Sequence, residues 1–302
     1  MELRVLEYFL AVAREESISG AAQFLHLSQP TLSRQLKELE TSLGKQLFLR
    51  GKRKITLTEE GRVLRKRAEE ILELVHRTER EIARSEELVS GDVYIGAGET
   101  VGMRYLTRAA YLLQREHPGV RFHVSSGDSI DVYEQLDRGL VDFGLLFDGA
   151  DGTKYHSLRI PYQDTWGVLM RKDSPLAGKE TVALSDLKGL PLILSRQVHA
   201  ASFLKEQLGA AAGELWISGT YNLLFNGSLM VEDHLGYAVC LGNIVRVSED
   251  SALCFKALQG APRAEMNVVW KKHRGFSRAA EQYLEKLMEV IREKDGWEGP
   301  VR

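Results

Sequence analysis

The sequence contains little cysteine: Cys240 and Cys254 are the only two in 302 residues, and no zinc-ligand spacing surrounds them. This scarcity excludes a disulfide-stabilised scaffold. No apolar stretch approaches the roughly 18 residues of a membrane-spanning helix, and the start, Met1-Glu2-Leu3-Arg4, does not resemble a signal peptide. The net charge is only −2 at pH 7, so the charge of the whole chain predicts no partner. We therefore expect a cytoplasmic protein without a membrane segment.

The charge is distributed unevenly along the chain. Between Thr31 and Arg67 there are eleven Lys and Arg against four Glu, a net charge of +7, whereas from Gly91 onward 24 basic residues stand against 27 acidic ones. A compact basic segment on an otherwise acidic chain suits binding to a phosphate backbone. A solvated basic face without a partner is the alternative interpretation, so charge alone leaves nucleic-acid binding open.

The first 57 residues have the pattern of a three-helix domain. Apolar residues at helical spacing predict a helix over 2–14, and a short second helix follows it. Ser28 is a suitable N-cap for a third helix that ends at Gly44, with Pro30 in the first turn, where its missing N–H costs nothing. The leucines predicted to be buried by the third helix are Leu32, Leu36, Leu39 and Leu43.

The opposite face of this third helix is polar and suits contact with duplex DNA, because amide, hydroxyl and guanidinium groups read base edges in the major groove. After the helix, 46–50 and 55–57 are predicted as two short strands around a basic tip, a wing for the phosphate backbone or the minor groove. The residues predicted to contact DNA are Gln29, Pro30, Thr31, Ser33, Arg34, Lys37, Arg50, Lys52, Arg53 and Lys54. A structural domain with a basic surface is the alternative.

The same segment carries a longer signature. It comprises Ala21-Ala22, the run Leu27-Ser28-Gln29-Pro30-Thr31-Leu32-Ser33-Arg34-Gln35-Leu36-Lys37-Glu38-Leu39-Glu40, then Leu43-Gly44, Leu47-Phe48-Leu49-Arg50 and Leu57-Thr58-Glu59-Glu60-Gly61. This signature resembles the winged helix-turn-helix of LysR-type transcriptional regulators. The resemblance implies that residues 18–37 contact double-stranded DNA and that a homodimer or tetramer binds inverted repeats. It also implies control by a small effector, with RNA polymerase as a further candidate contact.

Residues 58–89 are predicted to form one long helix that begins at Thr58, with Glu59 and Glu60 at the positive end of its dipole. Two interleaved series of seven-residue repeats run along it, which is the spacing of a coiled-coil seam. The residues predicted to form a dimer contact are Leu64, Ala68, Ile71, Val75 and Ile82. A helix packed on the first domain of its own chain is the alternative. A dimer matters because two recognition helices on a two-fold axis read a pseudo-palindrome.

After residue 91, short apolar runs alternate with amphipathic helical patterns, which predicts an α/β fold with largely parallel sheets. Strands are expected at 92–97, 120–125, 141–147, 165–171, 192–195, 215–219, 237–241 and 266–271, and helices at 101–116, 129–138, 200–208, 222–233 and 277–292. The family resemblance implies a two-lobed, periplasmic-binding-protein-like (type 2) effector domain. The expected organisation is a winged helix-turn-helix domain (1–57), a dimerisation linker helix (58–89) and an effector-binding domain (91–302), with lobe I at 91–161 and 268–302 and lobe II at 162–267.

Ligands of such sheets bind beyond the carboxyl ends of the strands, where helices begin. The strand-to-helix joints therefore supply the candidate effector-binding residues, which are Thr100, Ser126, Phe147, Ser195, Arg196 and Asn222. Thr100 and Ser195 are predicted to donate hydrogen bonds, and Arg196 is a candidate partner for a carboxylate. A plain N-cap is the alternative role for each hydroxyl.

Other classes of function lack their motifs. Residues 96–102 lie between a strand and a helix like a dinucleotide-binding loop, but the spacing G-x-G-x-x-x-G is one residue too long. There is no G-x-S-x-G elbow for a hydrolase and no close pair of histidines for a metal ion. A solute-binding protein would explain residues 91–302 but not the basic first domain. We therefore expect a DNA-binding regulator rather than an enzyme, without cofactor or metal.

Overall fold

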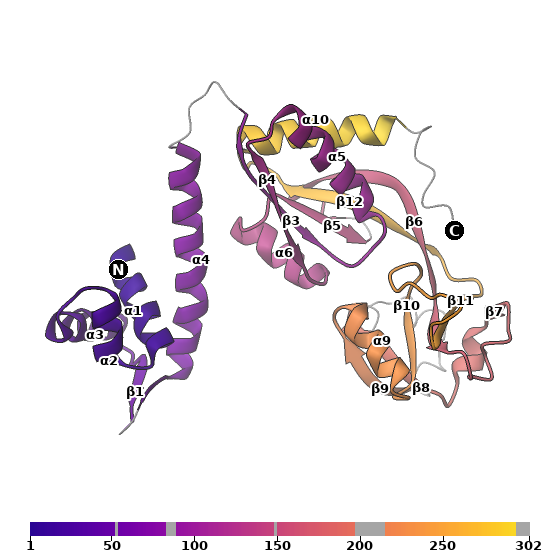
Figure 1. Cartoon of the computed structure of the whole chain (residues 1–302), viewed down its shortest axis with the longest axis horizontal. Helices are drawn as coiled ribbons and strands as arrows, with labels where there is room; N and C mark the ends of the chain where they lie inside the picture. Colours follow the sequence, from indigo (N-terminus) through magenta and orange to yellow (C-terminus); the bar gives the residue numbers. More distant parts are fainter. Residues whose placement is uncertain (52–53, 83–88, 148–149, 197–214, 294–302) are drawn as a thin grey trace. The chain divides into compact units, whose positions relative to one another are not determined.

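The computed structural model describes residues 1–51, 54–82, 89–147, 150–196 and 215–293, and the chain divides into two compact units, Met1–Arg84 and Ser85–Arg302. Figure 1 shows the first unit in indigo and violet and the second from purple through orange to yellow. In these described ranges no helix is both long enough and apolar enough to cross a membrane.

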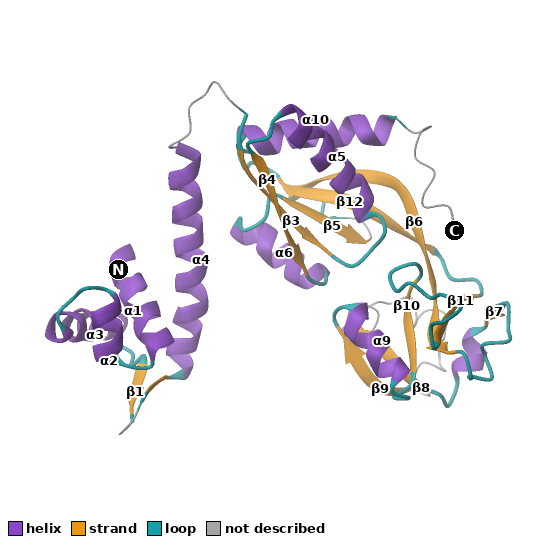
Figure 2. Cartoon of the chain, viewed as in Figure 1, coloured by secondary structure: helices purple, strands orange, loops and turns teal. Residues whose placement is uncertain are grey.

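The first unit is made of four helices and a small hairpin. Its elements are α1 (Leu3–Glu15), α2 (Ile18–Phe24), α3 (Gln29–Leu43), β1 (Phe48–Arg50), β2 (Ile55–Leu57) and α4 (Glu59–Ile82). β1 and β2 pair antiparallel, as the predicted wing requires. Figure 2 shows how the three short helices precede the hairpin and the long helix α4.

Local capping explains where the recognition and linker helices begin and end. The Ser28 hydroxyl accepts a hydrogen bond from the Thr31 N–H at the start of α3, and Gly44 ends the helix in the left-handed conformation at φ 64°. At the start of α4 the Thr58 hydroxyl accepts a bond from the N–H of Gly61. A Cβ at Gly61 would lie 2.2 Å from the Leu47 carbonyl oxygen, so a glycine is required for this close approach.

The core of the first unit lies between α1, α2, α3 and the hairpin. Phe9 is fully buried, and its ring centroid lies 5.1 Å from that of Phe48. The α3 residues that reach this core are Leu32, Leu36 and Leu39. The expectation that Leu43 is buried is wrong: 42% of it is exposed, because it is the last residue of α3.

The long helix α4 packs on α1 of the same chain. Leu6 of α1 forms a buried cluster with Ala68 and Leu72, and Leu64 and Ile71 pack against its edge. Intramolecular packing, the alternative interpretation of the heptad pattern, therefore accounts for one side of this helix.

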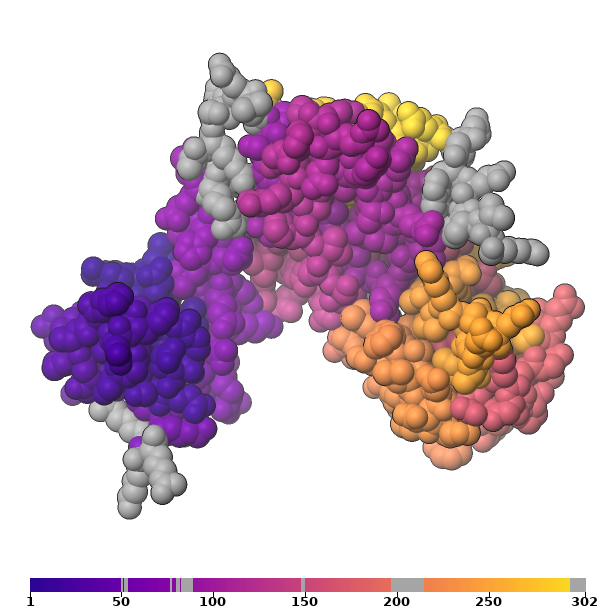
Figure 3. Space-filling view, viewed as in Figure 1, coloured from indigo at the N-terminus to yellow at the C-terminus, as the bar shows by residue number. Residues whose placement is uncertain are grey.

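The second unit is an α/β structure in two lobes, which appear as adjoining masses in the space-filling view (Figure 3). The first lobe contains β3 (Gly91–Ala97), α5 (Met103–Glu116), β4 (Val120–Ser126), α6 (Ser129–Arg138), β5 (Phe143–Phe147) and the C-terminal α10 (Arg278–Arg292). The second contains β7 (Thr181–Val182), η1 (Leu184–Leu187), β8 (Pro191–Ser195), β9 (Trp216–Tyr221), α9 (Leu224–Glu232), β10 (Tyr237–Leu241) and β11 (Leu253–Leu258). Two long strands, β6 (Tyr155–Arg171) and β12 (Arg263–Lys271), run between the lobes.

Strand pairing is parallel, as expected, among the strands that belong to one lobe, whereas the crossing strands pair antiparallel with β5, β10 and β11. β3 pairs parallel with β4 and β5, and β8 pairs parallel with β9 and β10. The crossing strands β6 and β12 pair antiparallel, with a register shift between Glu265 and Asn267. Among the described residues these strands join both lobes into one sheet in the order β4-β3-β5-β12-β6-β10-β8-β9.

Several element boundaries differ from the sequence expectation. The strand expected at 165–171 is the end of the much longer β6, which begins at Tyr155, and the strands β7 and β11 were not expected at all. The helix expected at 200–208 lies outside the described residues. β11 was missed because its polar Lys256 interrupts a short apolar run that is only half-buried against β6.

Candidate functional site

The polar face of α3 is exposed over its first two turns. Gln29, Pro30, Thr31, Arg34 and Lys37 are exposed, and Ser33 is half-buried. The other face is fixed by the buried leucines, so packing holds this helix with its polar side chains toward solvent. This is the geometry that direct contact with a DNA groove requires.

The Arg34 side chain on this face can leave its present ion-pair partner to contact DNA. The Arg34 guanidinium lies 3.7 Å from the Glu38 carboxylate, and 72% and 60% of the two side chains are exposed. An exposed pair of this kind contributes about 0–1 kcal/mol, so a phosphate or a base edge can replace Glu38 at little cost. The Thr31 hydroxyl contacts the Ser28 hydroxyl at 2.7 Å, so Thr31 also supports the start of the helix.

The wing is described only in part. Lys52, Arg53 and the side chain of Arg50 lie outside the described residues. Lys54 is exposed, and its Nζ lies 3.0 Å from the Glu16 carboxylate, which ties the wing to the end of α1.

Of the five residues predicted to form a dimer contact, three contact α1 of their own chain. Leu64 and Ile71 are partly buried there, and Ala68 is fully buried, so the Ala68 side chain has no exposed surface with which to meet a second copy. Val75 is half-buried outside this cluster, and 79% of Ile82 is exposed. Val63, which the heptad pattern did not include, is 61% exposed on α4.

Three of the predicted effector-binding residues meet between the lobes of the second unit. Phe147 at the end of β5, Ser195 at the end of β8 and Asn222 before α9 line one small cavity of about 50 Å³. Trp166 and Tyr221 complete its aromatic walls. These strand ends therefore converge, as expected for sheets of this type, although the element that follows Phe147 is the strand β6 and not a helix.

Thr100 and Ser126 line a neighbouring cavity of about 320 Å³, which also contains Asn243 and Met103. The Thr100 hydroxyl donates to the Asp164 carboxylate at 2.9 Å and accepts a bond from the Gly102 N–H. Because a hydroxyl has one proton to donate, the Thr100 hydroxyl is already engaged by Asp164 and by the Gly102 N–H just before α5.

Arg196 lines neither cavity. Its guanidinium pairs with Asp128 and, at 3.1 Å, with Asp131, the two carboxylates that form the capping box of α6. The arginine predicted to bind a ligand carboxylate thus bridges the second lobe to the first through carboxylates of its own chain.

Glu99 was not among the predicted site residues, although it precedes Thr100 in the same joint. Its Oε2 accepts a hydrogen bond from the backbone N–H of Leu224, the first residue of α9 in the other lobe. Glu99 lines both cavities. The signal that could have identified it is its place directly after a buried strand.

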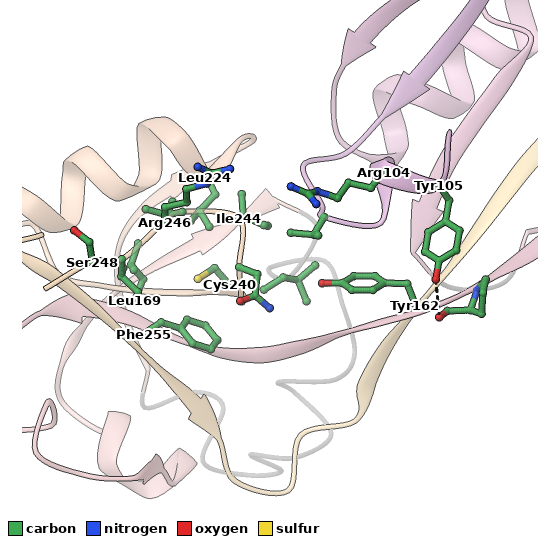
Figure 4. Close-up of a pocket in the computed structure, with 16 residues that line it drawn as sticks. Arg104, Tyr105, Tyr162, Leu169, Leu224, Cys240, Ile244, Arg246, Ser248 and Phe255 are labelled. Carbon is green, nitrogen blue, oxygen red and sulfur yellow. Dashed lines mark hydrogen bonds between the residues drawn. The ribbon is translucent and has the colours of Figure 1, made fainter. Parts of the chain in front are cut away.

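A wider groove of about 1020 Å³ lies on another side of the contact between the lobes. In Figure 4, Arg104 of α5 and Tyr162 of the crossing strand β6 point toward the middle of the groove, whereas Arg246 and Phe255 come from the second lobe. Tyr105 donates a hydrogen bond to the Pro161 carbonyl at 3.3 Å, which fixes the start of α5 against β6.

Asp164 is a buried charged group at this contact, with 1% of it exposed. Burial raises the pKa of its carboxyl, while the hydrogen bonds from Tyr162 and Thr100 act in the opposite direction. An acid whose pKa is raised on folding binds more protons when folded, so its ionisation lowers the free energy of unfolding as the pH rises through the folded pKa.

Asp164→Asn should therefore raise the melting temperature of the second unit relative to the wild type at neutral pH. The difference should shrink as the pH falls toward about 4, the pKa of an unfolded aspartate, because the wild-type carboxyl is then protonated in both states. All four tryptophans lie at position 166 or beyond, so tryptophan fluorescence follows this unit alone. Asp233→Asn, on an exposed aspartate, is the control; a difference that does not vary with pH would contradict the assignment.

Family models match most of the chain. The bacterial regulatory helix-turn-helix model of the lysR family matches residues 3–62, and the LysR substrate binding domain matches residues 86–292. The chain belongs to the LysR family of helix-turn-helix transcriptional regulators. It combines a DNA-binding helix-turn-helix domain with a domain of the effector-binding type, as the sequence resemblance indicated.

Individual proteins agree with this assignment. A hydrogen peroxide-inducible genes activator of Dickeya chrysanthemi is 31% identical over 200 residues, which span 66% of this chain and 65% of that protein, slightly under two thirds of its length. The regulator YfeR of Shigella flexneri is 28% identical over 97% of this chain and 94% of that one. The crystal structure of full-length CbnR with its target DNA has the same fold, with a TM-score of 0.72 at 21% identity over 97% of this chain and 99% of CbnR.

Proposed function

We propose that this protein is a cytoplasmic regulator that binds a pseudo-palindromic promoter site as a homodimer or tetramer, under the control of a small molecule bound between its two lobes. The observation that carries the proposal is the exposed polar face of α3 opposite the face that buries Leu32, Leu36 and Leu39. Wing residues Arg50, Lys52, Arg53 and Lys54 supply further phosphate contacts in this account.

The dimer contact that we propose uses the part of α4 that does not pack on α1. Val75 and Ile82, with Val63 as an addition, are apolar residues of α4 outside the cluster with α1. Two copies joined along α4 would present two α3 helices to successive half-sites of one duplex.

The effector, in this proposal, acts through the lobes. Polar contacts from Glu99 to Leu224 and from Arg196 to Asp128 join the lobes around the small cavity. A ligand that changes these contacts changes lobe closure, and hence the spacing of the two winged domains on DNA or the contact with RNA polymerase.

We do not propose that this protein senses peroxide through its two cysteines. Burial raises the pKa of the Cys240 thiol to about 12 and also raises the pKa of Cys254. Cys240 pairs with Gly167 on one edge of β6, and Cys254 pairs with Met170 on the other edge. Two strand spacings separate these edges, which exceeds the reach of a disulfide, so this pair does not have the geometry of a redox switch.

Arg34→Ala tests the reading of DNA by α3. If Arg34 contacts a base, the change should cost about 1–3 kcal/mol on the cognate site and relax the preference for one base pair. Binding should be measured by fluorescence anisotropy on the selected site and on all single base-pair variants of it, at fixed salt concentration.

Arg4→Ala, on an exposed arginine of α1, is the matched control and should leave the base preference unchanged. Equal weakening of Arg34→Ala on every duplex would mean that Arg34 contacts only phosphate, and unchanged binding would remove α3 from the interface.

A further inference from the structure

Glu99 of the first lobe contacts the start of a helix in the second lobe. It follows β3 in the first lobe, and its carboxylate accepts the N–H of Leu224 at the start of α9 in the second. One carboxylate oxygen is engaged by this bond, which leaves the other oxygen for a further donor.

Among the described residues that line these two cavities, Glu99 is the one charged side chain. The smaller one has aromatic walls formed by Phe147, Trp166 and Tyr221. The wider one is lined by apolar and neutral polar groups such as Met103, Val124 and Ser126. The cation of the neighbouring joint, Arg196, is already paired with two aspartates, so it does not offset the charge of Glu99.

We propose that the effector of this protein carries a positively charged group, a primary amine or ammonium, which pairs with Glu99 while an apolar body lies along the aromatic walls. This inference rests on the proposed function, because it names the class of molecule that the cleft between the lobes binds. An ammonium donates a charge-assisted hydrogen bond to the carboxylate and interacts favourably with ring faces. A carboxylate ligand would instead meet a like charge, with no cation among the described residues that line the two cavities.

The same pairing connects ligand binding to the contact between the lobes. An ammonium at Glu99 shares the carboxylate with the Leu224 N–H, so occupancy changes the strength of a bond that joins the lobes. The arginine-lined groove differs in chemistry: Arg104 and Arg246 line it and Glu99 does not, so an anionic ligand would be attracted there (Figure 4).

The test uses the full-length protein and amines matched in skeleton: benzylamine, phenethylamine and cyclohexylmethylamine, each with its alcohol and its carboxylate. Thermal shift followed by tryptophan fluorescence ranks them, and calorimetry gives the affinities. At least one amine should bind about tenfold tighter than its matched alcohol and carboxylate. Glu99→Gln should reduce that amine to the affinity of the alcohol, whereas Glu180→Gln, which removes the same charge at an exposed site that lines neither cavity, should retain the preference.

Three results would overturn the proposal. One is a panel in which no amine is preferred, another is an amine preference that survives Glu99→Gln, and the third is a carboxylate that binds more tightly in Glu99→Gln than in the wild type. The third result would show that these cavities bind an anionic ligand once the Glu99 charge is removed. It would contradict the amine proposal but not the proposal of an effector site between the lobes. Failure of the DNA-binding proposal is seen separately, in the measurements on Arg34→Ala.

Discussion

Replacing Phe9 by alanine should cost the first unit about 3–5 kcal/mol of its free energy of unfolding, the usual effect of deleting a buried phenylalanine. Phe9 is fully buried and packs on Phe48 of the wing, so its ring joins α1 to both α3 and the hairpin. Because a domain of this size is stable by only about 5–15 kcal/mol, the loss should unfold much of the first unit at physiological temperature and abolish DNA binding.

The position of the tryptophans makes this result easy to assign. Circular dichroism should show an early transition that Phe9→Ala moves to lower temperature, while tryptophan fluorescence, which follows only the second unit, should not change. Phe24→Ala is the control, because 56% of Phe24 is exposed and the Arg14 guanidinium lies over its ring, 4.1 Å from the centroid. Equal effects of the two substitutions would show that the core is not where the structure places it.

Replacing the two basic residues of α3 by acids, with Arg34→Glu and Lys37→Glu, should weaken specific DNA binding by at least about a hundredfold. The change removes two cations from the helix face and adds two anions beside Glu38, so the helix then repels phosphates. Electrophoretic mobility shift at several salt concentrations should show that the slope of binding affinity against salt also becomes shallower.

The matched control is Arg4→Glu with Arg14→Glu, which makes the same charge change on exposed positions of α1. It should weaken binding only through the general field of the domain, by a few-fold at most at physiological salt. If both double variants lose affinity equally while their melting temperatures are retained, α3 has no special role in recognition.

The recognition helix could be predicted from the sequence because its determinants are local. Ser28, Pro30 and Gly44 fix its ends through hydrogen bonds and backbone conformation within a few residues. The period of its leucines then fixes which face is exposed. Leu43 was misassigned because periodicity continues to the last residue, whereas the core does not.

The role of α4 could be predicted only in part. Heptad spacing shows that an apolar stripe exists but not which surface covers it. Leu72, which lies outside both series, belongs to the same buried cluster as Leu6 and Ala68. The dimer contact of Val75 and Ile82 stays a prediction.

At the candidate effector site, the sequence predicted which segments meet but not how their charged side chains pair. The joints after strands were correctly located, so Phe147, Ser195 and Asn222 do meet. The sequence could not show that Arg196 finds partners in its own chain, or that Glu99 rather than Thr100 faces the cavities with its charge, because both facts depend on how the second lobe packs on the first.

Selection of duplex DNA from a random library by the full-length protein shows whether two α3 helices read one site. A dimer joined along α4 should enrich an inverted repeat whose half-sites are about one helical turn, or a multiple of it, apart. Arg34→Ala should select the same spacing with one relaxed position in each half-site. No enriched sequence, or a single half-site bound by a monomer, would contradict DNA recognition by paired α3 helices.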